Sequence, residues 1–228
     1  MSRAIICDFG GVLTTPLGNS FAAWSRESGI PLEDLGDAMA AAAERHGEHP
    51  LFMLEKGLLD QGEFTRRLEL ELGGERRLDT MVDVYFKYLE RNPETIGYMR
   101  ELRDRGLRTA LLTNNVREWE PTWRAMLPEI DEIFEVVVDS AFVGMRKPEP
   151  EIYTLTVERL GGGIEPADCV FVDDMAINCD AARELGMTAV VFENAEQTRI
   201  EVEAALAQEP PRAEASDRVE RSERVERR

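Results

Sequence analysis

Five short apolar runs, separated from one another by helical sequence, constrain the fold of this 228-residue chain more than any other feature. They comprise residues 4–7, 108–113, 135–138, 169–172 and 188–191. Short apolar runs that alternate with helices are typical of parallel strands whose two faces are both covered. We therefore predict an α/β fold with a parallel sheet of about five strands and helices on both of its faces.

A long helical stretch interrupts this alternation after the first run. Residues 19–90 follow a helical pattern with breaks that contain glycine and proline, which predicts a small bundle of four or five helices. We assign residues 1–16 and 91–207 to a core that holds the sheet, and residues 17–90 to a helical cap. Residues 208–228 repeat arginine and glutamate without an apolar face, which predicts a disordered charged tail.

Charge and cysteine content narrow the expected partners and location. The formal net charge of -18 at pH 7 repels nucleic acids and anionic membrane surfaces. An anionic substrate would need a bound cation or a nearby lysine to reverse this field. The three cysteines are typical of buried, reduced thiols, and no apolar run approaches the ~20 residues of a membrane span. We expect a cytoplasmic protein that binds neither nucleic acid nor membrane.

Residues with useful chemistry lie at or after the ends of four predicted strands. Asp8 follows the first strand, Thr113 ends the second, Lys147 lies after the third, and Asp173 and Asp174 follow the fourth. The carboxyl ends of parallel strands meet at one edge of a sheet, where open α/β folds bind ligands. Carboxylates suit Mg²⁺, and a lysine and a hydroxyl can hold a phosphoryl group. Alone, an aspartate before two glycines is more typical of a turn, so the prediction depends on all of these strand ends together.

Four segments of the chain, in this order, resemble the motifs of the haloacid dehalogenase superfamily. They are residues 8–13, 111–114, 146–150 and 172–178. The resemblance extends from residue 3 to about residue 192, and residues 144–150 and 171–174 also look like the N-terminal phosphatase-type domain of soluble epoxide hydrolases. It implies a Rossmann-like, doubly wound core with a helical cap after the first motif. It also implies a Mg²⁺-dependent phosphatase that acts on a small phosphorylated metabolite through an aspartyl-phosphate intermediate.

The same resemblance implies roles for the residues that would contact the substrate. Asp8 would be the nucleophile, and Thr113 and Lys147 would hold the transferring phosphoryl group. Lys147 would also balance the charge of Asp8. Asn114 would contact the phosphate through its backbone or its side chain.

A Mg²⁺ site is implied by the same motifs. Asp8, the backbone carbonyl of Gly10 and Asp174 would be its protein ligands. Asp173 would face the lysine or the waters on the metal. Asn178, one helical turn further on, would bind one of these waters.

Gly10 departs from the family's usual pattern. Phosphatases of the family usually carry a second aspartate here, whose carbonyl binds the metal and whose carboxyl group acts as general acid and base. Gly10 keeps the carbonyl but lacks the carboxyl group. Because the loss of a general acid or base costs ~10²–10⁴-fold in rate, we expect slow turnover, a substrate with a good leaving group, or a replacement acid from the cap.

Two alternatives to a phosphatase stay open at this point. A non-catalytic relative would bind a phosphorylated ligand or a protein in the same cleft, with Gly10 as the mark of lost activity. A 2-haloacid dehalogenase also lacks an acid at this position, because a halide leaves without a proton. That enzyme works without metal, however, and the adjacent carboxylates of Asp173 and Asp174 are costly unless a cation binds. The phosphatase is therefore favoured.

Other prominent side chains of the sequence are expected to be structural. We expect Phe21, Trp24, Trp119 and Trp123 to contribute to packing rather than to a substrate cage, although Phe21 and Trp24 lie where the cap would face the active site. Glu55 and Lys56 are expected to be solvated charges, although a polar group of the cap is the natural candidate for a replacement acid.

Overall fold

The predicted parallel sheet is present in the computed structural model, which describes residues 3–208. Its five strands are, in spatial order, β3 (Val136–Asp139), β2 (Arg108–Thr113), β1 (Ala4–Cys7), β4 (Cys169–Asp173) and β5 (Thr188–Val191). Every neighbouring pair of strands is parallel. Because the strand order runs outward from β1 in both directions, the sheet is doubly wound, and the predicted Rossmann-like class is confirmed.

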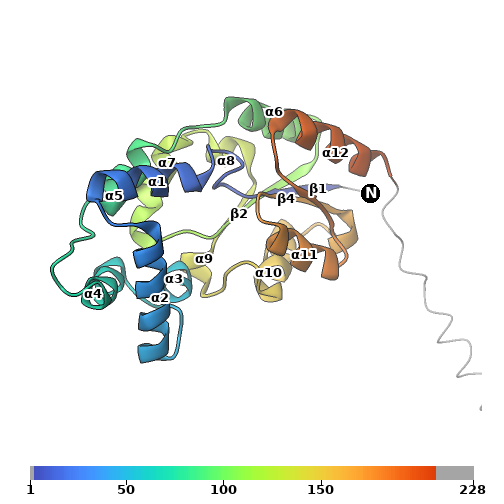
Figure 1. Cartoon of the computed structure of the whole chain (residues 1–228). Helices are drawn as coiled ribbons and strands as arrows, with labels where there is room; N and C mark the ends of the chain where they lie inside the picture. The colour runs from blue at the N-terminus through green and yellow to red at the C-terminus, as the bar shows by residue number, and fades with distance from the viewer. Residues whose placement is uncertain (1–2, 209–228) are drawn as a thin grey trace, which may run out of the picture.

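Alternating side chains of the strands build one hydrophobic core on each face of the sheet. On β1, Ile5 and Cys7 face the first core, and Ala4 and Ile6 face the second. The first core is completed by α6 (Pro93–Asp104), α7 (Glu120–Met126), α8 (Ile130–Ile133) and α12 (Ala195–Ala207), and the second by α10 (Pro150–Leu160) and α11 (Ala176–Glu184). Figure 1 shows α6 and α12 on one side of the sheet and α10 and α11 on the other.

Short elements in this part of the chain depart from the prediction. They are the 3-10 helices η1 (Arg117–Trp119) and η2 (Pro166–Asp168) and the helix α9 (Ser140–Val143). Residues 117–126 are divided into η1 and α7, and α7 has a proline in its first turn, where a missing N–H is tolerated. The helices α8 and α9 were not predicted because four residues are too few to show a helical period.

The helical stretch after β1 forms five helices that pack on one another. They are α1 (Leu17–Ser28), α2 (Leu32–His46), α3 (Pro50–Glu55), α4 (Gln61–Glu71) and α5 (Met81–Lys87). These helices, called the helical insert below, share a third hydrophobic core that includes the buried side chains of Trp24, Leu54 and Leu68. Figure 1 shows α1 to α5 together at one end of the molecule.

The helical insert leaves and rejoins the rest of the chain at one place. Thr14 and Arg91 form an isolated antiparallel bridge, and the Asn92 N–H donates to the carbonyl oxygen of Leu13 at 2.9 Å. Asn92 also caps α6, because its side chain accepts a hydrogen bond from the Thr95 N–H. This neck fixes the insert beside the carboxyl ends of the strands.

Two other expectations concern membranes and the end of the chain. Within residues 3–208, every helix is either too short or too polar to cross a bilayer. The charged tail predicted over residues 208–228 lies outside the described residues, apart from residue 208.

Candidate active site

Three adjacent strands place polar residues at one edge of the sheet. Asp8 directly follows β1, Thr113 is the last residue of β2, and Asp173 is the last residue of β4. β1 lies between the other two, and the Asp8 N–H donates to the carbonyl oxygen of Val172 at 2.9 Å. Residues that are far apart in the sequence therefore meet at this edge, as the sequence predicted.

Lys147 reaches this edge from the loop between α9 and α10, residues 144–149, which we call the lysine loop. Its side chain is 1% exposed, and its Nζ lies 2.7 Å from Asp8 Oδ1 and 2.6 Å from Asp173 Oδ2. The Asn114 side chain holds the backbone of the same residue. Asn114 Oδ1 accepts from the Lys147 N–H at 2.9 Å, and Asn114 Nδ2 donates to the Lys147 carbonyl oxygen at 3.0 Å. The amide of Asn114 thus positions the lysine.

Three carboxylates share this edge with a single ammonium group. One oxygen from each of Asp8, Asp173 and Asp174 lies within 4.8 Å of the others, and among residues 3–208 only Lys147 forms ion pairs with them. Burial raises the pKa of Asp8 to about 7, although Lys147 opposes this shift. Burial would lower the pKa of Lys147, but the charges of Asp173 and Asp8 outweigh it and raise that pKa. One cation for three carboxylates leaves an excess of negative charge that suits a divalent metal ion.

Asp173 is the most firmly anchored of the three carboxylates. Its Oδ1 accepts from the Met175 N–H and from Asn178 Nδ2, both at 2.9 Å, while its Oδ2 accepts from the lysine. Asp173 is fully buried, and Asn178 on α11 holds it in place. Asp174 differs because it is half-buried and lines a cavity. Its pKa is raised by burial and then by the charge of Asp173.

The two glycines after Asp8 create space at different points. Gly11 has a φ of +76°, and a Cβ atom there would lie 2.2 Å from Asp174 Oδ2, so only glycine lets the turn approach this carboxylate. Beside Gly10 the neighbour is apolar: a Cβ atom there would lie 3.0 Å from Leu17 Cδ1. The place where a relative would carry an acid therefore faces the side chain of Leu17.

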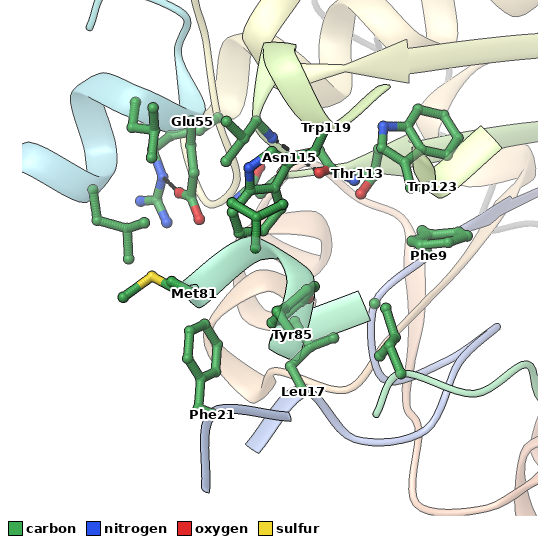
Figure 2. Close-up of a pocket in the computed structure, with 18 of the residues that line it drawn as sticks. Phe9, Leu17, Phe21, Glu55, Met81, Tyr85, Thr113, Asn115, Trp119 and Trp123 are labelled. Carbon is green, nitrogen blue, oxygen red and sulfur yellow. Dashed lines mark hydrogen bonds and ion pairs between the residues drawn. The ribbon is translucent and has the colours of Figure 1, made fainter. Parts of the chain in front are cut away.

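A cavity of about 340 Å³ extends from the carboxylates toward the helical insert. Its lining includes Thr113 and Lys147 at the polar end and, further out, the apolar side chains of Phe21, Met81 and Tyr85. Figure 2 shows these three apolar side chains on one side of the cavity and Thr113 on the opposite side. The Thr113 hydroxyl accepts and donates no hydrogen bond within the described residues, so it is available to a ligand.

Trp119, Trp123 and Phe21, which the sequence assigned to packing, all line this cavity. Trp123 also packs within the first core, where its ring lies 5.3 Å from that of Phe9. Phe21 and Trp119 instead stand on either side of the Tyr85 ring. Phe21 was expected where the helical insert faces the active site, but the sequence could not show which side chains of η1 and α7 would meet the insert.

Two ion pairs join the end of α3 to the lysine loop. Arg146 Nε donates to Glu55 Oε2 at 2.6 Å, and Lys56 pairs with Glu149. The expectation that Glu55 and Lys56 are solvated charges is therefore wrong, since their side chains are only 16% and 24% exposed. Burial raises the pKa of Glu55, and Arg146 opposes this shift. The contact between the end of α3 and the lysine loop shields these side chains from solvent, and no local sequence pattern predicts such a contact.

The four strand-end segments also match a known family as a whole. A model of haloacid dehalogenase-like hydrolases matches residues 2–186. The chain belongs to this family. The match confirms the resemblance on which the sequence analysis rested, and it covers the helical insert as well as most of the sheet.

Two curated relatives of this haloacid dehalogenase-like (HAD) hydrolase differ greatly in length. Phosphatase MT3486 from Mycobacterium tuberculosis is 29% identical over 205 residues, which cover 86% of this chain and 89% of that protein. Bifunctional epoxide hydrolase 2 from Mus musculus is 30% identical over 118 residues, which cover 49% of this chain and 20% of that protein. The chain thus spans about a fifth of the length of the larger curated relatives that it matches.

A solved structure shares the fold of this HAD hydrolase. It is the HAD family enzyme BT-2542 from Bacteroides thetaiotaomicron in complex with magnesium and inorganic phosphate. The TM-score is 0.62 at 23% identity, and the match covers 85% of this chain and 97% of that chain. At this level of identity the likeness establishes the common fold.

Proposed function

We propose that this HAD hydrolase is a Mg²⁺-dependent phosphatase that acts on a small phosphorylated substrate through an aspartyl-phosphate intermediate. The observation that carries the proposal is the cluster of three carboxylates, two of which pair with the single ammonium of Lys147. The names of two relatives support it, since one is a phosphatase and the other was solved with magnesium and phosphate. The negative cluster would repel a phosphate unless a cation were bound.

The residues at the strand ends fit a Mg²⁺ ion by their chemistry. Asp8, Asp174 and the backbone carbonyl of Gly10 would hold the ion, because oxygen atoms are the ligands that Mg²⁺ prefers. Asp173 and Asn178 would support the site from behind, as their mutual hydrogen bond at 2.9 Å indicates. When bound, the ion would neutralise charge on the phosphoryl oxygens during transfer.

Asp8 is the natural nucleophile of this site. Its Oδ1 accepts from the Phe9 N–H at 2.7 Å and from Lys147 Nζ at 2.7 Å, while Oδ2 accepts no hydrogen bond within the described residues. In the proposed reaction Oδ2 forms a bond to phosphorus, and the bond from phosphorus to the ester oxygen breaks with its electron pair. Lys147 and the Thr113 hydroxyl would stabilise the charge on the transferring group.

A water molecule would complete the reaction. Its oxygen bonds to phosphorus, the bond between phosphorus and Asp8 breaks, and inorganic phosphate leaves as the carboxylate is restored. No carboxyl group at position 10 assists the departing alcohol or this water, so we expect turnover ~10²–10⁴-fold below that of a site with such a group.

We propose that the helical insert, residues 17–90, is the cap of this enzyme and that residues 1–16 and 91–207 are its catalytic core. The separate hydrophobic core of the insert and its single neck at residues 14 and 91 support this division. The cavity supports it too, because side chains from the insert complete its apolar part.

The direct test is Mg²⁺-dependent release of phosphate from p-nitrophenyl phosphate by the native chain and by Asp8→Asn. We expect the variant to lose activity by at least ~10³-fold, as for loss of a nucleophile that chemistry requires. Asp8→Asn should nevertheless unfold at the same or a higher temperature, because it removes one charge from a buried cluster that is rich in carboxylates.

Asp104→Asn is a matched control, since it makes the same chemical change on a side chain that is 59% exposed. The proposal fails if Asp8→Asn keeps the activity of the native chain. If neither protein releases phosphate with Mg²⁺ while both bind a phosphorylated ligand, the chain is a binding module. Release of halide from a 2-haloacid without metal would identify a dehalogenase.

A further inference from the structure

The apolar part of the cavity is lined by aliphatic side chains and by a group of aromatic rings that contact one another. Phe21, Tyr85, Phe86 and Trp119 form a chain of tilted and edge contacts with ring-centroid distances between 5.0 and 5.5 Å. We call these four residues the aromatic cluster, and all four line the cavity. Figure 2 shows Phe21, Tyr85 and Trp119 around one hollow. Surfaces of this kind bind apolar, flat groups through burial and ring contacts.

Two polar side chains beside the aromatic cluster are already paired with other side chains. Gln61 Oε1 accepts from Trp119 Nε1 at 2.7 Å, and Glu55 accepts from Arg146 at 2.6 Å. A sugar or polyol would bury hydroxyl groups beside side chains whose oxygens already accept hydrogen bonds. Each buried hydroxyl without a hydrogen-bond partner weakens binding by roughly tenfold or more. The cavity therefore favours a substrate whose body beyond the phosphate is apolar.

The chemistry at Gly10 restricts the leaving group independently of the cavity. No acid is present there, and Leu17 Cδ1 lies 3.0 Å from the position of a Cβ atom. The departing oxygen must then leave with little protonation. A phenol has a pKa of ~10, as in tyrosine, whereas a simple alcohol is closer to the ~15.7 of water. A phenolate is thus a far better leaving group at this site than an alkoxide.

Two other proton carriers line the cavity, and neither is a good replacement acid. Glu55 is held by Arg146 in a half-buried ion pair, which opposes the rise that burial causes in its pKa. The hydroxyl of Tyr85 is a weak acid, since burial and then the charges of Asp8, Glu55 and Asp174 raise its pKa. Both observations leave the alcohol of an alkyl phosphate without an efficient proton donor.

On the basis of the proposed phosphatase function, we propose that the substrate is an aryl phosphate, the monophosphate ester of a phenol that carries one or two apolar rings. Its phosphoryl group would lie between Lys147 and the carboxylates, and its rings would lie against the aromatic cluster. The volume of about 340 Å³ lies near the lower end of the ~300–1,000 Å³ that is usual for ligand cavities, which suits a compact body of this size.

Four phosphates separate the contributions of the ring and of the leaving group. We would measure Mg²⁺-dependent phosphate release from 1-naphthyl phosphate, phenyl phosphate, hexyl phosphate and acetyl phosphate. We expect kcat/KM for 1-naphthyl phosphate to exceed that for phenyl phosphate at least tenfold, because the second ring adds buried apolar area. Hexyl phosphate should be at least ~100-fold slower than 1-naphthyl phosphate, as for a reaction without its general acid.

A variant of the aromatic cluster tests the binding of the ring. Phe21→Ala should reduce the preference for 1-naphthyl over phenyl phosphate to less than threefold. The milder Phe21→Leu should show the same trend if Phe21→Ala folds poorly. Phe142→Ala is the matched control, because Phe142 is 50% exposed and does not line this cavity.

Binding of a non-hydrolysable analogue gives a second readout that does not depend on turnover. By calorimetry, Phe21→Ala should bind 1-naphthyl phosphonate at least fivefold more weakly than the native chain does and should bind methyl phosphonate equally well. Equal loss of affinity for both phosphonates would overturn the assignment of the ring site.

The outcomes distinguish this proposal from the proposed function. If acetyl phosphate is hydrolysed and Asp8→Asn abolishes that activity, but hexyl phosphate matches 1-naphthyl phosphate, the aryl class is wrong and the phosphatase stands. Equal values for phenyl and 1-naphthyl phosphate would also overturn the aryl class. If no phosphate is released from acetyl phosphate, the phosphatase function itself fails.

Discussion

Gly11→Ala should damage the proposed metal site through a single methyl group. A Cβ atom at this position would lie 2.2 Å from Asp174 Oδ2 and 2.8 Å from Asp174 Cγ. Ordinary contact begins near 3.4 Å, so the carboxylate or the turn must move by about 1.2 Å. A misplacement of ~1 Å at a reacting centre can cost ~10²-fold in rate, and we expect a loss of this size in kcat/KM.

The backbone strain of this substitution can be measured separately. Gly11 has a φ of +76°, and an L-residue in this region costs roughly 1–2 kcal/mol. Gly29 has a φ of +70° but has no atom within 4 Å of its hypothetical Cβ. Gly29→Ala therefore carries the same strain without the clash. For a chain of this length each kcal/mol lowers the melting temperature by ~2–4 °C, so both variants should melt ~2–8 °C lower.

The assay compares the two variants for phosphate release and for Mg²⁺ dependence. We expect Gly29→Ala to keep the native kcat/KM within twofold and the native Mg²⁺ requirement. Gly11→Ala should need a higher Mg²⁺ concentration for half-maximal activity and should gain less thermal stability from added Mg²⁺. If Gly11→Ala retained native activity and Mg²⁺ dependence while both variants melted equally early, the turn would not confine Asp174 and the reasoning would be refuted.

Three further variants test the leaving-group chemistry, the buried acid at the end of β3, and the buried lysine. Gly10→Asp, combined with Leu17→Ala to make room, should raise kcat for hexyl phosphate more than for phenyl phosphate; equal gains would show that Gly10 does not limit departure of the alcohol. Burial raises the pKa of Asp139 from 3.8 to about 6. Between about pH 4 and pH 6 the folded chain therefore binds more protons than the unfolded chain does, and its stability falls as pH rises through this range. Asp139→Asn keeps an acceptor for the Ala141 N–H and should be more stable than the native chain at pH 7, by up to roughly 3 kcal/mol in urea unfolding, and the difference should shrink below pH 4. If the stability difference between Asp139→Asn and the native chain stayed the same from pH 7 to below pH 4, the raised pKa of Asp139 would be contradicted. Lys147→Met leaves two carboxylates without their ammonium partner and should lower the free energy of unfolding by ~3–5 kcal/mol. Added Mg²⁺ should restore part of this loss. A smaller loss that Mg²⁺ does not change would argue against a shared charge cluster.

Controls for the last two variants are available on the surface. Asp104→Asn and Lys87→Met change side chains that are 59% and 58% exposed. Exposed ion pairs contribute little to stability, so both controls should remain within ~1 kcal/mol of the native chain at every pH tested.

Much of the sheet could be predicted because its signals are local. Apolar runs of four to six residues, alternating with helices, indicated a parallel sheet. The positions of the polar residues along the chain indicated which strand ends would carry them. Asp8 and Lys147 could be expected at one edge because parallel strands all end on the same side of a sheet. Their contact at 2.7 Å agrees with that expectation.

The partners of several residues could not be predicted from such local signals. The resemblance implied a contact between Asn114 and the phosphate, through the backbone or the side chain, but no local signal indicated that the Asn114 side chain also holds the backbone of Lys147. Glu55 was expected in solvent, but it is half-buried against Arg146, 91 residues further along the chain. Short helices of four residues were also missed, because they are too short to show a period.

The sequence by itself determined the strands, the helical insert and the kinds of residue at the strand ends, because each of these depends on neighbours along the chain. Only the tertiary structure decided what those residues meet. It placed Leu17 beside Gly10 and brought Phe21 together with Trp119 across Tyr85. These contacts depend on how whole helices pack against the edge of the sheet, and a hydrophobic pattern specifies that a helix has a buried face but not which side chains it will face.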